Sequence, residues 1–360
     1  MNDMGKLLFL VLDGAADDPS NPPTPYMAAN KPGLDELAKS SIMGMHYPIG
    51  KGIAPESDAA VMSILGYDPD KYYTGRGPLE ALGAGYRIKD GYEVAFRANF
   101  ATIDSSRNII DRRVGRNLTS EEAAELARAV DGMELNGGEG YARVIPTIGH
   151  RAVVIIGSQS KLSGLVSNND PGYVRQGKIS IAVPNPGTKL PLIEALDSSK
   201  EAERTARLAN EFMEKAIQLL ANHEVNKKRV REGKLPGNVI LMRDAGHEVP
   251  HVKPIREVFG LSFGAVTEMP VERGIAIALG MDSAPVSKYS GSKEEILMER
   301  LDATIQLLKR VDVAYVHLKG PDEPGHDGDF KRKVAEIEAI DKYYVQRLSL
   351  KDVAILVTSD

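Results

Sequence analysis

The strongest constraint on this fold is a set of short, continuously apolar segments that end at acidic or turn residues. The run KLLFLVL at Lys6–Leu12 ends at Asp13-Gly14, and the run VAILV at 353–357 is followed closely by Asp360. Short apolar runs bounded by turn residues are typical of strands buried on both faces. Similar runs occupy 238–242, Phe263–Val266 and 311–317, and strands are also expected at 94–103 and 151–156.

Helical patterns lie between these predicted strands. Thr119 stands three residues before Glu122, which is a capping-box signature, and the helix that it opens extends to about Val130. Other helices are expected at 33–41, 200–223, 271–279, 294–309 and 334–348, while 19–32 is predicted to be a long loop. Alternating strands and helices predict an α/β fold with a largely parallel sheet flanked by helices. A chain of 360 residues is long enough for two domains of roughly 150 residues each.

Polar residues follow the predicted strands at positions far apart in the sequence. Asp13, His317, Asp322 and Asp360 each come shortly after an apolar segment. In parallel sheets sites form at the carboxyl ends of strands, so these residues are expected to meet at one edge. The chain stops at Asp360, directly after a predicted buried strand. We interpret this as the loss of a C-terminal segment that would supply further ligands.

Composition limits which partners and metals fit this chain. The net charge is −5, so bulk charge does not favour nucleic acid or anionic lipid as a partner. The sequence contains no Cys, so any metal must be held by oxygen and nitrogen ligands. The start of the chain lacks the pattern of a signal peptide, and Lys6–Leu12 is too short to span a bilayer. A cytoplasmic location is therefore expected.

The segment 321–329, PDEPGHDGD, crowds acidic side chains around one histidine. Asp322 and His326 can both turn inward on such a loop, and together they suit Mn, Zn, Co or Mg. A solvated acidic turn that ends in a helix cap would produce the same pattern. Asp13 has a similar alternative, because an Asp-Gly pair is a common turn.

Ser57 is the candidate nucleophile. It follows a glycine-rich loop and opens a short apolar helix, where free N–H groups and the helix dipole favour an anion. A divalent ion beside the hydroxyl would lower its pKa and activate it. The alternative interpretation is an ordinary N-cap serine.

Basic residues of the middle region are candidates for binding an anionic substrate. Arginine binds phosphate and carboxylate through two parallel hydrogen bonds. A solvated surface would also account for these residues. The candidates are Arg113, Arg116, His150, Arg151 and Arg243.

Several segments together resemble the archaeal-type, cofactor-independent phosphoglycerate mutases of the alkaline phosphatase superfamily. They are VLDGAAD, PESDAAVMSILGYDP, YTGRGPLEALGAGY, NFATID with IIDRRVGR, GHRAVV, HEVNKKRVREGKLPGN and VHLKGPDEPGHDGDFKRKVAEIEAID. The likeness extends over essentially the whole chain. It implies an alkaline-phosphatase-like core formed by 1–92 and 252–360, with an inserted α/β cap at 93–251.

The resemblance also implies roles for individual residues. Asp13, Ser57 and Asp360 resemble the ligands of one metal, and Asp322 and His326 resemble those of a second. His317 is expected to contact the metal ligands without binding a metal itself. The implied cofactors are two divalent ions, Mn first and Zn, Co or Mg as alternatives, without 2,3-bisphosphoglycerate.

The implied reaction interconverts 3-phosphoglycerate and 2-phosphoglycerate through a phosphoserine on Ser57, with the cap excluding water. The partner would be a small phosphorylated hydroxy acid, with no nucleic acid or membrane involved. Three alternatives use the same site: a phosphatase, a phosphopentomutase or another small-molecule phosphotransferase. A further alternative is a degenerate member that binds but does not catalyse.

Overall fold

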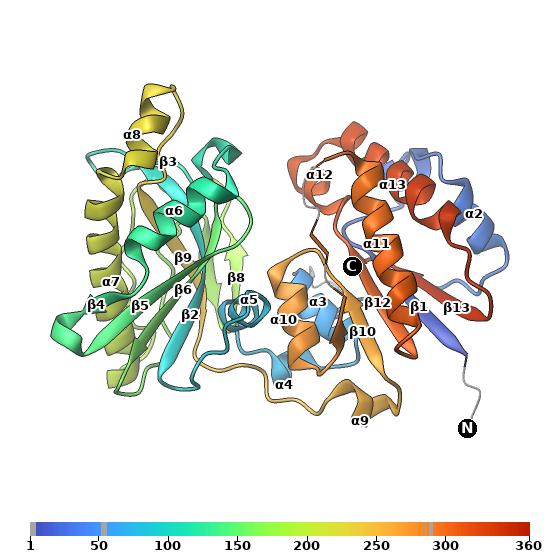
Figure 1. Ribbon diagram of the computed structural model, residues 1–360, viewed down its shortest axis with the longest axis horizontal. Helices are drawn as coiled ribbons and strands as arrows, with labels where there is room; N and C mark the ends of the chain where they lie inside the picture. Colours follow the sequence, from blue (N-terminus) through green and yellow to red (C-terminus); the bar gives the residue numbers. More distant parts are fainter. Residues whose placement is uncertain (1–4, 52–55, 285, 288–290) are drawn as a thin grey trace. The chain divides into compact units, whose positions relative to one another are not determined.

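The chain forms two compact units, shown in Figure 1. The computed structural model describes residues 5–51, 56–284, 286–287 and 291–360. The first unit comprises 1–72 and 251–360, and the second comprises 73–250. The sequence placed this boundary at 92/93. Residues 73–92 group with the second unit because α5 (Arg76–Gly83) packs on β2 (Glu93–Ile103) and β9 (Val239–Gly246).

The first unit is built on a five-stranded parallel sheet. Its strand order is β11 (Asp282–Ser283), β10 (Phe263–Val266), β12 (Val313–Leu318), β1 (Lys6–Leu12) and β13 (Val353–Thr358). The central strands β1 and β12 are aligned so that Val11 pairs with His317 and Leu12 with Leu318. The carboxyl ends of these strands therefore lie together, as expected for a sheet of this type.

Helices complete the core of the first unit. Alternate residues of β1 (Leu8, Leu10 and Leu12) pack with leucines of α11 (Lys293–Leu308) and with Ile340 of α13 (Phe330–Tyr343). Elsewhere α3 (Ser57–Ile64) packs against α10 (Pro270–Ala278). The remaining helices are α1 (Pro25–Ala28), α2 (Pro32–Lys39), α4 (Pro69–Tyr72), α9 (Ile255–Phe259), α12 (Asp322–Asp327) and the 3₁₀ turn Val345–Arg347.

The second unit contains an antiparallel sheet. Its order is β3 (Ile109–Asp111), β2, β6 (Arg151–Ser158), β5 (Gly140–Pro146) and β4 (Met133–Leu135), and β9 also pairs with β2. A separate hairpin joins β7 (Tyr173–Gln176) and β8 (Ile179–Ala182). The alternation of strands and helices predicted a largely parallel sheet, but the strands of this unit are antiparallel.

One face of the second sheet carries the apolar core. Phe96, Ala98 and Phe100 of β2 pack with α6 (Ser120–Val130) and α7 (Lys200–Ala221), and Figure 1 shows these two helices beside the sheet. The capping box of α6 forms as predicted, between Thr119 and Glu122. Because side chains alternate along a strand, Arg97 and Asn99 point to the opposite face.

Several predicted elements differ from the structure, including the helix expected at 334–348, which is found at Phe330–Tyr343. The loop expected at 19–32 contains α1, because the Thr24 hydroxyl accepts a hydrogen bond from the Met27 N–H at 3.2 Å. The strand expected to stop at Met242 continues to Gly246 through a register shift opposite Ala95 and Arg97. The helix expected to reach residue 223 ends at Ala221, and α8 (Glu224–Arg231) follows. Among the described residues, no helix is long and apolar enough to cross a membrane.

Candidate active site

The carboxyl edge of the first sheet brings Asp13 beside Asp360 and α12. Asp13 follows β1 and is only 2% exposed. The backbone N–H of Gly14 donates to Oδ1 of Asp360 at 3.2 Å. Gly14 has φ +66°, and a Cβ at this position would lie 2.6 Å from the Cα of Asp322. The Asp13-Gly14 turn therefore permits a close approach that a side chain would prevent.

Ser57 is the first residue of α3, as the sequence predicted. Its Oγ accepts a hydrogen bond from the ammonium of Lys319 at 3.3 Å. The residues 52–55 of the preceding glycine-rich segment lie outside the described part of the chain. The helix start and the neighbouring ammonium both favour negative charge on this oxygen.

Lys319 lies at the centre of the cluster, and the sequence analysis missed it. Its Nζ contacts Oδ2 of Asp13, lies 3.3 Å from Oδ2 of Asp322 and lies 3.8 Å from Oε1 of Glu272. A lysine directly after a strand, at the edge where Asp13 also ends a strand, was the available signal. The prediction used only the acidic residues and the histidine of the segment that follows Lys319.

Asp322 and His326 lie on a short helix, so the predicted loop was wrong here. α12 begins after Pro321, contains Pro324 in its first turn and is followed by Gly328, which has φ +67°. Spacing of four residues places both side chains on one face, with Nε2 of His326 3.3 Å from Oδ1 of Asp322. Burial opposes the shift, but His326 and Lys319 lower the pKa of Asp322 to about 2.

Several buried polar side chains at the carboxyl edge of the first sheet have no hydrogen-bond partner among the described residues, and together they form a candidate cation site. One ligand atom each from Asp13, Glu272 and His317 lie within 4.8 Å of one another. Nε2 of His317 is 4.0 Å from Asp13 and 3.8 Å from Asp360. Both oxygens of Glu272, both ring nitrogens of His317 and Oδ2 of Asp360 are buried without a hydrogen bond. Carboxylate and imidazole groups left in this way suit a divalent ion.

His317 lies inside β12 rather than after the strand. Burial would lower its pKa, but the carboxylates of Asp360, Asp13 and Glu272 outweigh burial and raise the pKa to about 9. For the carboxyl group of Asp13, burial raises the pKa to about 7, although the charges of Lys319 and His317 act in the opposite direction. The carboxyl groups of the cluster, on Asp13, Glu272, Asp322 and Asp360, outnumber the basic groups on Lys319, His317 and His326.

The second unit contains a buried cluster of opposite charge. Arg97 of β2 pairs directly with Arg243 of β9 in the sheet, on the face away from the apolar core. Like charges placed opposite each other destabilise a sheet. The Nε atom of each arginine is buried without a hydrogen bond. Burial, together with Arg243 and Arg76, lowers the pKa of Arg97 to about 9.

Two carboxylates only partly neutralise these arginines. Glu80 of α5 accepts from Nε of Arg76 at 2.8 Å and lies 3.5 Å from Nε of Arg97. Asp244 lies 3.0 Å from Arg243, whose guanidinium also stacks 3.7 Å from the ring centre of Tyr173. A remaining positive charge in a buried setting favours an anion.

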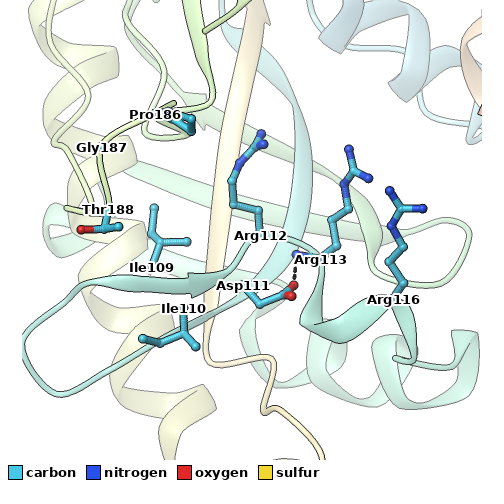
Figure 2. A pocket seen from close by; sticks show the side chains of 9 residues that line it. All are labelled: Ile109, Ile110, Asp111, Arg112, Arg113, Arg116, Pro186, Gly187 and Thr188. Carbon is cyan, nitrogen blue, oxygen red and sulfur yellow. Dashed lines mark hydrogen bonds between the residues drawn. The ribbon is translucent and has the colours of Figure 1, made fainter. Parts of the chain in front are cut away.

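The other basic candidates lie near this charge. Burial and then the charges of Arg151, Arg113, Arg97 and Arg116 lower the pKa of His150 to about 3. Figure 2 shows Arg112, Arg113 and Arg116 extending from the turn after β3, beside a pocket of about 320 Å³. Arg112 is held by two hydrogen bonds to Asp170.

The first unit has a parallel sheet with buried acidic residues and a serine at its carboxyl edge, and the second unit is inserted within it and contains buried arginines. This arrangement is that of an alkaline-phosphatase-like protein. The family model described as 2,3-bisphosphoglycerate-independent phosphoglycerate mutase matches residues 38–226. The chain belongs to this family, whose members are isomerases.

Similar proteins support this assignment over nearly the full chain. A 2,3-bisphosphoglycerate-independent phosphoglycerate mutase of Aeropyrum pernix is 47% identical, covering 99% of this chain and 86% of the relative. One from Archaeoglobus fulgidus is 38% identical, covering 98% and 83%. The solved cofactor-independent phosphoglycerate mutase of Thermoplasma acidophilum is similar at 32% identity and a TM-score of 0.59, covering 99% and 87%.

Proposed function

We propose that this chain interconverts 3-phosphoglycerate and 2-phosphoglycerate through a phosphoserine on Ser57. The observation that supports this most strongly is the placement of the Ser57 hydroxyl. It lies at a helix start and within 3.3 Å of an ammonium that also contacts Asp13 and Asp322. In a chain of the mutase family, such a hydroxyl is the natural acceptor for a phosphoryl group.

In the first transfer, Ser57 Oγ attacks phosphorus and the bond from phosphorus to the oxygen on C3 of glycerate breaks. The serine proton leaves, and the released oxygen gains a proton. In the second transfer, the C2 hydroxyl attacks the phosphoserine and the Oγ–phosphorus bond breaks. Atoms and protons therefore balance over the cycle, and no separate phosphate donor is consumed.

One divalent ion would be held by Asp13, Ser57 and Asp360, and another by Asp322 and His326. The side chains of His317 and Glu272 would lie next to these ligands. When bound, such ions lower the pKa of the serine hydroxyl and neutralise charge on the transferring group. Manganese is our first candidate. The unpartnered oxygens of Glu272 and Asp360 support a cation in this cluster.

We assign substrate binding to basic residues of the second unit. Among the described residues, the Nε atoms of Arg97 and Arg243 are buried without a hydrogen bond, and Nε of Arg97 has only an ion pair at 3.5 Å with Glu80. With Arg113, Arg116 and Arg151 they supply the paired donors that carboxylate and phosphate oxygens accept. The low pKa of His150 leaves its ring neutral at physiological pH, so it can accept as well as donate a hydrogen bond.

The test measures conversion of 3-phosphoglycerate in two assays, one coupled to enolase and one detecting free phosphate. Protein supplied with Mn should give product in the enolase assay, and EDTA should stop it. Release of free phosphate at the higher rate would identify a phosphatase instead. No turnover in either assay with Mn, Co or Zn would favour a member that binds without catalysis.

A further inference from the structure

Lys319 is held in place by a buried ion pair behind it. Its backbone N–H donates to Oε2 of Glu268 at 2.8 Å, and Oε1 of Glu268 accepts from Nε of Arg300 at 3.0 Å. Arg300 is only 1% exposed. The main chain at Lys319 is therefore anchored, and its side chain is directed at the carboxylates of the site.

The ammonium of Lys319 contacts three groups assigned to metal binding. It donates hydrogen bonds to Oδ2 of Asp13 and, at 3.3 Å, to Oγ of Ser57. It also forms an ion pair with Oδ2 of Asp322 at 3.3 Å. Asp13 and Ser57 belong to one proposed ion position and Asp322 to the other, so this single cation joins both.

We propose that Lys319 is an internal counter-cation that competes with divalent metal. It neutralises Asp13 and Asp322 when metal has been removed, and it must leave these oxygens before metal binds. This inference rests on the metal ligands assigned under the proposed function.

The competition follows from charge and geometry. The same carboxylate oxygens serve the ammonium, and a divalent ion held by those oxygens would be repelled by a positive charge a few ångströms away. Lysine can withdraw because its charge is carried on a flexible stem, and this side chain is 21% exposed. A loss of stability that is confined to the chelated form also appears as tighter metal binding, because the two equilibria are linked.

The experiment compares Mn binding by wild-type protein, Lys319→Met and Lys31→Met after treatment with EDTA. Calorimetry or the electron paramagnetic resonance signal of free Mn gives the affinity, and a thermal scan in EDTA gives Tm. We expect Lys319→Met to bind Mn about tenfold tighter than wild type and to have a lower Tm in EDTA. Lys31 pairs with Asp35 at 3.2 Å, outside this cluster, and its variant should keep wild-type Mn affinity.

Equal or weaker Mn binding by Lys319→Met, with unchanged Tm in EDTA, would overturn the inference. If this variant does not fold in EDTA, Lys319→Gln, which keeps a hydrogen-bond donor without the charge, is judged by the same criteria. The proposed function fails separately, by absence of Mn-dependent turnover in the wild type. A wild type that binds Mn and turns over substrate would leave the competition as the only question.

Discussion

The two units bury ionisable side chains of opposite sign. In the first, Asp13, Glu272 and Asp360 surround the cations Lys319 and His317. In the second, Arg97 and Arg243 face each other across two strands with too few carboxylates beside them. Each cluster is costly when its charge is left uncompensated. The first is therefore suited to cations and the second to anions.

The difference in surrounding charge shifts the pKa of one histidine in each unit in opposite directions. His317 is buried and His150 is partly buried, and burial by itself lowers the pKa of an imidazole. The pKa of His150 falls to about 3 among arginines, whereas that of His317 rises to about 9 among carboxylates. The sign of the surrounding charge decides the direction at His317 and reinforces burial at His150.

The largest effect should come from Ser57→Ala, which leaves both charged clusters intact but removes the phosphoryl acceptor. We expect mutase turnover to fall on the order of 10⁴-fold or more, as for other nucleophile removals. Acid-quenched protein analysed by mass spectrometry should lose the phosphorylated species. Ser63→Ala, in the same helix, is the control and should retain activity. A phosphoenzyme formed on another residue would show that the nucleophile is misassigned.

Asp322→Asn tests the negative cluster by removing one carboxylate. We expect Mn affinity to fall by about 100-fold or more, because even partners of metal ligands change affinity by up to about that factor. Equilibrium dialysis with metal analysis measures both affinity and stoichiometry. Asp35→Asn, at an exposed helical ion pair, should leave both unchanged. Two ions bound with wild-type affinity in Asp322→Asn would remove this residue from the ligand set.

Arg97→Met tests the positive cluster. We expect KM for 3-phosphoglycerate to rise by about 10- to 100-fold, the range for losing a hydrogen bond to a charged group. Tm should stay equal or rise, because the substitution relieves repulsion from Arg243 and leaves Glu80 paired with Arg76. Arg143→Met, at a surface pair with Asp131, is the control. A normal KM with a lower Tm would make Arg97 a structural residue only.

The smallest effect concerns acid stability and His150. Its folded pKa of about 3 lies below the ordinary 6.5, so the unfolded chain binds more protons between these values. The stability contribution is present above pH 6.5 and is lost as pH falls toward 3. We expect His150→Gln to lessen this loss by on the order of 1 kcal/mol between pH 6.5 and 4. Urea unfolding at several pH values measures it, and parallel curves for both proteins would contradict it.

The first cluster was largely predictable, since its residues stand in contiguous motifs at strand ends. Asp13, Ser57, Asp322 and Asp360 were each identified from a local pattern, and the parallel sheet then brings them together. Glu272 gave no such signal, because it lies in the first turn of α10, where an acidic residue is ordinary.

The second cluster was less predictable. Arg97 occurs within the apolar strand β2, and its importance depends on pairing with β9, far away in the sequence. Strand pairing and direction are set by tertiary packing, which the period of a strand does not encode. For the same reason the antiparallel order of this sheet could not be predicted from apolar runs.

The contact at Gly14 has a consequence for altering this protein. The turn at Gly14 lies so close to the start of α12 that a Cβ on residue 14 would lie 2.6 Å from the Cα of Asp322. The spacing between Asp13 and Asp322 is therefore limited by the smallest possible group. A larger residue at position 14 would be strained by its positive φ and would force the backbone at Asp322 to move, so this position must stay glycine if the distance between Asp13 and Asp322 is to be kept.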